Sequence, residues 1–126
     1  MISKGTNLVV ADNSGGKKVH CIHILGSSKQ RYTKMGRILL VSARKVRPKK
    51  KIVKKKIYRA LLISTKKEQR RKRVTFIKFK ENRVLMLSDQ SKFLGTRVYG
   101  PICKEMRGGN NELNYKTIIS YSRATV

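Results

Sequence analysis

Lysine and arginine are the residues whose type and spacing point most directly to chemistry in this sequence. Two basic runs flank an apolar stretch, residues 57–65. The first run consists of Arg44, Lys45, Arg47, Lys49, Lys50, Lys51, Lys54, Lys55 and Lys56, and the second of Lys66, Lys67, Arg70, Arg71, Lys72 and Arg73. Residues 13–67 include 18 basic side chains and no acidic one. Blocks of like charge are usually disordered or bind a polyanion. Because these blocks flank a strand-like segment, they predict two basic loops mounted on a folded domain.

The composition of the whole chain favours nucleic acid as the polyanion. Its 126 residues include 32 basic and 6 acidic side chains, which gives a net charge of +26. A solvated surface mixes both signs, whereas such an excess favours nucleic acid or an anionic membrane. Phosphates are the favoured partner, because their contacts with Lys and Arg supply most sequence-independent affinity. The residues predicted to bind RNA are Lys17, Lys18, Lys29, Arg31, Arg44, Lys49, Lys50, Lys51, Lys54, Lys55, Lys56, Lys66, Arg70, Arg71, Lys72, Arg73, Arg97 and Arg107.

Aromatic side chains are weaker candidates for RNA recognition. Phe76, Phe79 and Tyr58 could stack on bases, and residues 76–79 resemble half of the signature of the RNA-recognition motif. Arg73 stands where that signature needs glycine, and the two amphipathic helices of that fold are missing. Burial in the core is the favoured role of both Phe residues. Since the chain has no Trp, structured or duplex RNA fits better than a single strand.

Two histidines and two cysteines raise the question of a metal site. Strand alternation places Cys21 and His23 on one face and His20 on the other, and no second ligand pair lies at zinc-finger spacing. Packed strand residues are therefore favoured over zinc. Cys21 and Cys103 have apolar neighbours and are expected to be reduced core residues rather than a disulfide. No cofactor is predicted.

Catalysis has little support in the sequence. The chain has no P-loop, no Gly-x-Ser-x-Gly and no His-Glu-x-x-His. Residues 14–17 and 26–29 could each form an amide nest for a phosphate, although ordinary turns are the favoured role. We therefore expect a binding protein and not an enzyme. The alternatives are a free RNA-binding regulator and an RNA-directed enzyme, which would need paired carboxylates or a metal near the basic loops.

A set of short strands is predicted to position the basic loops. The expected strands are residues 6–11, 19–25, 37–46, 57–65, 74–79 and 83–87. Short strands at this spacing, without a long helical period, are typical of an all-β barrel or sandwich. Residues 101–108 are expected to form a short helix with Ile102 and Met106 stacked, and the pattern leaves the type of residues 115–121 open. Nothing indicates a linker, so residues 1–126 are expected to form one domain.

Several motifs, in order along the chain, carry a family resemblance. They are residues 7–15 (NLVVADNSG), 21–22, 25–26 and 31–32 near the start, residues 60–67 and Phe79-x-x-Asn82 in the centre, and residues 95–101, Glu105 and residues 118–120 towards the end. Together they closely resemble the L-fourteen family of large-subunit ribosomal proteins over nearly the whole chain.

The resemblance implies a mainly β fold, namely a small five-stranded β-barrel with a projecting β-ribbon and a short helical C-terminal part. It implies a structural protein that binds large-subunit rRNA near the subunit interface and contributes to a bridge to small-subunit rRNA. It also implies contact with a neighbouring protein of the L-nineteen family, and some members receive a silencing factor that blocks subunit joining. Arg73 and Val74 stand where the family usually has Asp-Gly, so we expect a remodelled, more basic ribbon turn.

The composition also resembles that of an organelle-encoded member of the family. The chain is rich in Lys, Asn and Ile, poor in acids, and residues 1–5 show no presequence pattern. We therefore expect a mitochondrial ribosome, with the bacterial cytoplasm or a plastid as the alternatives.

Overall fold

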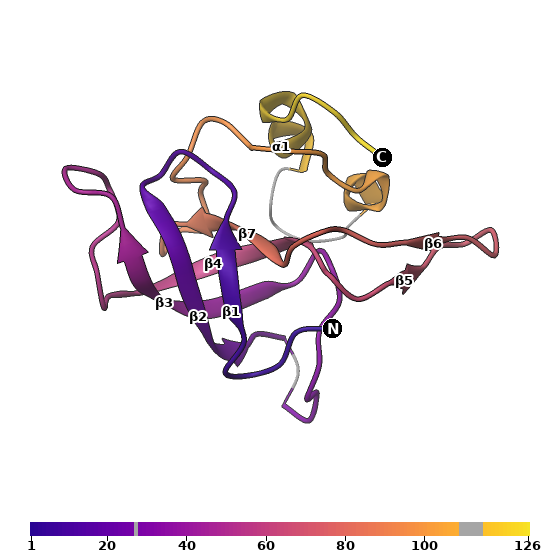
Figure 1. Ribbon diagram of the computed structural model, residues 1–126, viewed down its shortest axis with the longest axis horizontal. Coiled ribbons are helices and arrows are strands. Elements are labelled where there is room, and N and C mark those ends of the chain that lie inside the picture. Colours follow the sequence, from indigo (N-terminus) through magenta and orange to yellow (C-terminus); the bar gives the residue numbers. More distant parts are fainter. Residues whose placement is uncertain (27, 109–114) are drawn as a thin grey trace.

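The central element of the fold is a closed barrel. A computed structural model describes residues 1–26, 28–108 and 115–126, apart from the side chains of residues 107 and 108. Five strands close in the order β1–β2–β3–β4–β7 (Figure 1). Neighbouring strands are antiparallel except β1 and β7, whose parallel pairing closes the barrel. The strands are β1 (Asn7–Val10), β2 (Gly16–Ile24), β3 (Ile38–Val46), β4 (Ile57–Ser64) and β7 (Arg83–Leu87). The prediction of a mainly β fold with a five-stranded barrel is confirmed.

Alternate side chains of the strands fill the barrel. On β3, Leu39 and Val41 are fully buried in the interior cluster, as the two-residue period of a strand requires. On β2 the expected alternation is wrong after Cys21, because a β-bulge lies between Cys21 and His23. The extra residue reverses which side chains point inward, so Ile24 enters the core and His23 stays half-exposed.

Strand β4, like its neighbour β7, serves as core on both of its faces. Tyr58, Ala60 and Leu62 belong to the barrel interior, whereas Leu61 and Ile63 belong to a second cluster outside the barrel. The C-terminal part of the chain lies over this outer face (Figure 1). A strand that is covered on both faces carries a near-continuous apolar run, which explains the sequence of β4.

The C-terminal part contains two short helices, η1 (Lys104–Gly108) and α1 (Tyr115–Tyr121). The first begins later than predicted and is a 3-10 helix, but Ile102 and Met106 are both buried in the outer cluster. The second settles the type of the final element, and its Tyr115 and Ile118 face the same cluster. Among the described residues, no helix is long and apolar enough to cross a membrane.

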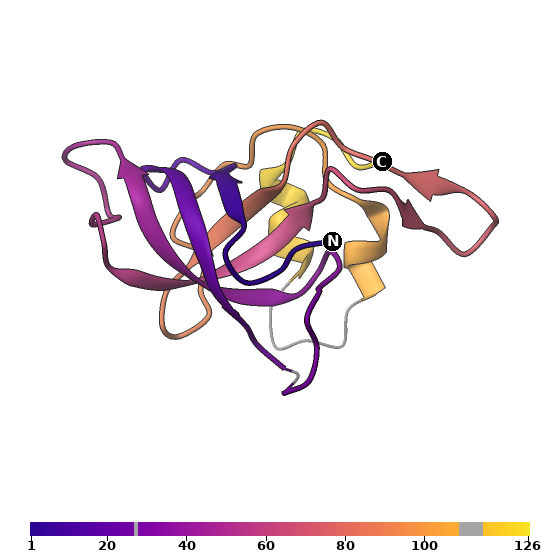
Figure 2. The same ribbon diagram turned by 60° about the horizontal axis from the view of Figure 1, so that its bottom comes forward.

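A two-stranded ribbon of β5 (Gln69–Arg70) and β6 (Phe76–Ile77) projects from the barrel (Figures 1 and 2). The strand expected over residues 74–79 is therefore shorter than predicted and lies outside the barrel. At the ribbon tip the Arg71 amide donates to the Thr75 carbonyl at 2.7 Å. Val74 adopts a φ of +52°, a conformation that β-branched residues rarely take.

Candidate nucleic-acid interface

Most of the first basic run forms the loop between β3 and β4, residues 47–56, and its Arg44 and Lys45 lie at the end of β3. Its backbone is held on the barrel, since the Arg47 amide donates to the Gly15 carbonyl at 2.7 Å and the Lys55 amide to the Ala43 carbonyl at 2.8 Å. Ile52 is buried in the barrel core. The lysine side chains around Ile52 are all exposed, namely Lys49, Lys50, Lys51, Lys54, Lys55 and Lys56. The fold therefore fixes the loop backbone and leaves its charges in solvent.

The turn after β1 packs directly against this loop. A Cβ on Gly15 would lie 2.2 Å from the Cβ of Lys50, and the φ of Gly15 is +111°, a conformation open to glycine. The turn is held by Asp12, whose buried carboxylate accepts hydrogen bonds from the Ser14 amide at 3.0 Å and the Met86 amide at 2.8 Å. Burial raises the pKa of Asp12, although these hydrogen bonds act in the opposite direction.

Asn13, in the same turn, binds the late motif of the sequence. Its side-chain oxygen accepts from the Thr96 amide at 2.8 Å and the Arg97 amide at 3.3 Å, and its amide group donates to Thr96 Oγ1 at 3.0 Å. Arg97 is thereby placed at the same end of the barrel as the lysine loop. An open hollow of about 470 Å³ lies next to the contact between Asn13 and Thr96. It is lined by Asn13, Ser14, Lys49, Lys50, Lys51, Leu94 and Thr96. Its ammonium, amide and hydroxyl groups match the oxygens of a phosphate.

The other side chains that were predicted to bind RNA lie in two separate regions. Lys17, Lys18 and Arg44 are exposed and join the lysine loop through the β2–β3 ladder, which pairs Lys18 with Lys45. Lys29 and Arg31 are also exposed, but they lie in the connection between β2 and β3, at the opposite end of β3 from the lysine loop. The side chain of Arg107 lies outside the described residues.

The second basic run is carried by the ribbon. The base of the ribbon is fixed by the Lys66 amide, which donates to Asn82 Oδ1 at 2.7 Å, and by the Phe79 amide, which donates to the Thr65 carbonyl at 3.1 Å. Its exposed candidates are Lys66, Arg70, Lys72 and Arg73. Strand β4 connects the lysine loop to the ribbon, and the two lie at opposite ends of the molecule (Figure 1). The two runs therefore form two separate basic surfaces.

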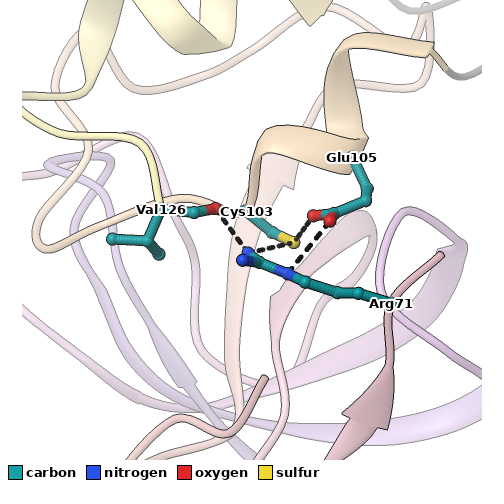
Figure 3. A network of polar contacts seen from close by, with 4 residues as sticks. All are labelled: Arg71, Cys103, Glu105 and Val126. Carbon is teal, nitrogen blue, oxygen red and sulfur yellow. Dashed lines mark hydrogen bonds and ion pairs between the residues drawn. The ribbon is translucent and has the colours of Figure 1, made fainter. Parts of the chain in front are cut away.

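Arg71 differs from the other candidates because its side chain is turned toward the protein body (Figure 3). Its Nε lies 2.9 Å from Glu105 Oε1, and its Nη2 donates to the Val126 carbonyl at 2.6 Å and to Cys103 Sγ at 3.6 Å. The Cys103 thiol in turn donates to Glu105. These contacts join the ribbon to η1 and leave fewer N–H groups of Arg71 for an outside ligand.

The contacts in this cluster shift the pKa values of Glu105 and Cys103. Partial burial acts against the Glu105 carboxylate, but the hydrogen bond from Cys103 and the charge of Arg71 outweigh it and lower the pKa of Glu105. Burial, followed by the hydrogen bond to Glu105, raises the pKa of Cys103, and burial also raises the pKa of Cys21. Protonated thiols are poor nucleophiles. Both cysteines are buried, which confirms that they are core residues.

Arg83 is a structural arginine to which the sequence pattern assigned no role. Its Nε donates to Ser64 Oγ at 3.0 Å, its Nη1 to the Tyr99 carbonyl at 2.6 Å and its Nη2 to the Pro101 carbonyl at 2.9 Å. A Cβ on Gly100 would lie 2.1 Å from Nη1, so this glycine leaves room for the guanidinium. Burial lowers the pKa of Arg83. The glycine next to Pro101 is the one sequence signal that accompanies this contact.

The aromatic candidates have different fates. Tyr58 is buried in the barrel and Phe79 packs against the outer cluster, which confirms a core role for Phe79. The same prediction is wrong for Phe76, whose exposed fraction is 61%. In the described part of the chain, no group of three or more His, Cys, Asp and Glu side chains could hold a metal ion.

The comparison with protein families agrees with this architecture. A family model described as ribosomal protein L14p/L23e matches residues 1–126. The chain belongs to this family. The L14-family protein is accordingly a structural protein of the large ribosomal subunit, and such proteins are in general not enzymes. Two of the motifs that carry the resemblance, the turn with Asn13 and the segment with Thr96, are hydrogen-bonded neighbours, which gives a physical reason for their joint occurrence.

Proposed function

We propose that this L14-family protein binds rRNA of the large subunit through its two basic surfaces. The loop surface consists of Lys17, Lys18, Arg44, Lys49, Lys50, Lys51, Lys54, Lys55, Lys56 and Arg97, and the ribbon surface of Lys66, Arg70, Lys72 and Arg73. The observation that carries the proposal is that the side chains of both surfaces are exposed on a hydrogen-bonded backbone. A chain of net charge +26 needs an anionic partner close to these side chains.

The separation of the surfaces favours contact with more than one RNA segment. A single short helix would meet one surface, whereas two surfaces at opposite ends of the molecule (Figure 1) suit a protein that lies between RNA helices. Lysine neutralises phosphates there as a point charge, and arginine can bridge two of them. Lys29 and Arg31 supply a third, smaller contact in the connection between β2 and β3.

The resemblance to the family supports the finer features of the proposal. They are a position near the subunit interface, a contribution to a bridge to small-subunit rRNA, and contact with a neighbouring protein of the L-nineteen family. The composition supports a mitochondrial ribosome, and the bacterial cytoplasm and a plastid are the alternatives.

A pair of charge-matched variants tests the RNA contacts. The loop variant changes three exposed lysines to Gln, namely Lys49, Lys50 and Lys54, and the control variant changes three exposed basic residues of the C-terminal part to Gln, namely Lys104, Lys116 and Arg123. Binding to purified large-subunit rRNA is measured over a range of salt concentrations. We expect the salt slope to fall by about three in the loop variant and by much less in the control. Equal losses in both would refute a role specific to the loop.

Sedimentation tests the assignment to the ribosome and the compartment. A gentle lysate of each organelle fraction is run through a gradient and probed for this chain. Comigration with the large subunit that resists moderate salt is the expected result, and the fraction in which it occurs identifies the compartment. A position at the top of the gradient would favour a free RNA-binding regulator.

A further inference from the structure

The ribbon has two chemically different faces. Its side chains alternate between half-buried and exposed from Gln69 to Phe79, apart from its tip. Gln69 pairs with Ile77 on the half-buried face, and Arg70 pairs with Phe76 on the exposed face. Directly paired residues project from the same side of a ribbon, so the side chains of Phe76 and Arg70 share the outer face.

Phe76 is exposed although the ribbon does pack against the core through its other face. The ribbon already supplies Ile77 and Phe79 to the outer cluster from its other face. Phe76 is 61% exposed and Val74, at the tip, is 77% exposed. The outer face therefore presents apolar surface that the rest of the described chain does not cover.

The charge around this ring indicates what covers it. Residues 66–80 include eight basic side chains, and Glu68 is the one acid among them. A protein that packed on the ring would have to bury or neutralise this charge, whereas RNA brings a phosphate with every base. Proteins recognise unpaired bases in structured RNA by stacking them on aromatic side chains, and such stacking tolerates any base.

We propose that Phe76 is a stacking platform for an unpaired RNA base, and that Arg70, Lys72 and Lys78 bind the phosphates beside that base. The inference rests on the proposed binding of RNA and specifies which RNA group one residue, Phe76, contacts. The contact between Arg71 and Glu105, with 2.9 Å between Nε and Oε1, fixes the ribbon on η1 (Figure 3). The ring is thus presented by a held element, which lowers the entropy cost of stacking.

Two oligonucleotides of equal charge test the proposal with the full chain. One is an oligoadenylate, and the other is an oligomer of the same length whose riboses lack bases. We expect the unmodified protein to prefer the oligoadenylate on the order of tenfold. Phe76→Leu keeps an apolar side chain without a π face and should remove most of this preference. It should leave the affinity for the baseless oligomer and the salt slope unchanged, and Phe76→Tyr should retain the preference.

Tyr99→Leu is the control, because Tyr99 is 51% exposed and lies outside the ribbon. A preference that survives in Phe76→Leu, or that Tyr99→Leu reduces as much, would overturn the stacking role. Failure of the unmodified protein to bind either oligomer in a salt-dependent way would instead overturn the proposed RNA binding. A preference unchanged in Phe76→Leu, together with easier release of that variant from large subunits, would assign the ring to a neighbouring protein.

Discussion

Replacement of Arg83 by lysine isolates the structural contribution of one guanidinium. The three nitrogens of Arg83 donate to Ser64, Tyr99 and Pro101 at 3.0, 2.6 and 2.9 Å. Lysine keeps the charge, but its single ammonium cannot reproduce the planar fork that reaches three separate acceptors, so we expect two of these acceptors to lose their partner. A hydrogen bond to a charged group contributes about 1.5–3 kcal/mol. Because Tyr99 is exposed, water can replace the hydrogen bond to its carbonyl, and the loss there is small. We therefore expect Arg83→Lys to destabilise the fold by about 3 kcal/mol.

Thermal unfolding followed by circular dichroism measures this loss. For a domain of this size, 1 kcal/mol corresponds to about 4 °C, so Tm should fall by about 12 °C. Arg97→Lys is the matched control, because the side chain of Arg97 is exposed and such substitutions change stability by less than about 0.5 kcal/mol. A melting temperature of Arg83→Lys within about 2 °C of the unmodified protein would refute the reasoning.

Gly100 provides an independent check on the same contact. Its φ is +83° and a Cβ there would lie 2.1 Å from Arg83 Nη1. Gly100→Ala should therefore displace the guanidinium and cost about as much as Arg83→Lys. In the Arg83→Lys background the cost should fall to the backbone strain alone, about 1 kcal/mol. Fully additive losses would show that the two residues act independently.

Three further outcomes follow from Asp12, Glu105 and Val74. Burial raises the pKa of Asp12 above its ordinary 3.8. The free energy of unfolding of the unmodified protein, relative to that of Asp12→Asn, should therefore fall as pH rises from 3.8 through the raised pKa. Urea unfolding across that window measures the difference, and a difference that grew with pH would contradict the expectation. The pKa of Glu105 lies below its ordinary 4.5. The stability of the unmodified protein relative to Glu105→Gln should therefore be complete above pH 4.5 and be lost as pH falls through the lowered pKa. Urea unfolding over this pH range measures the difference. Val74→Gly should relieve the positive φ at the ribbon tip and slow hydrogen exchange of the Arg71 amide, which donates to Thr75; faster exchange would exclude strain at Val74.

The barrel could be predicted because its strands carry a physical signature. Leu39 and Val41 alternate with less buried neighbours, and β4 reads as one apolar run because the C-terminal part covers its outer face. The reversal in β2 could not be predicted, since Ile22 and Ile24 are equally apolar and the bulge decides which of them is buried.

The candidate interface was predictable in composition but not in arrangement. Both basic runs lie next to β4 in the sequence, yet the strand carries them to opposite ends of the molecule. Arg71 differs from Arg70 only in strand phase, which turns one side chain toward Glu105 and leaves the other exposed. Phe76 was misjudged because apolar character alone does not reveal whether a fold has a partner for the ring.

The parallel ladder between β1 and β7 sets the order in which the chain can fold. Val9 pairs with Arg83. The Asp12 carboxylate accepts a hydrogen bond from the Met86 amide, which lies 74 positions later in the chain. Until that segment has left the translating ribosome, the barrel stays open while 18 basic residues and no acid lie between residues 13 and 67. Contacts of such long range make closure slow, and like charges oppose it. Counter-charge from RNA would relieve the repulsion, so barrel closure and incorporation into a particle are expected to assist each other.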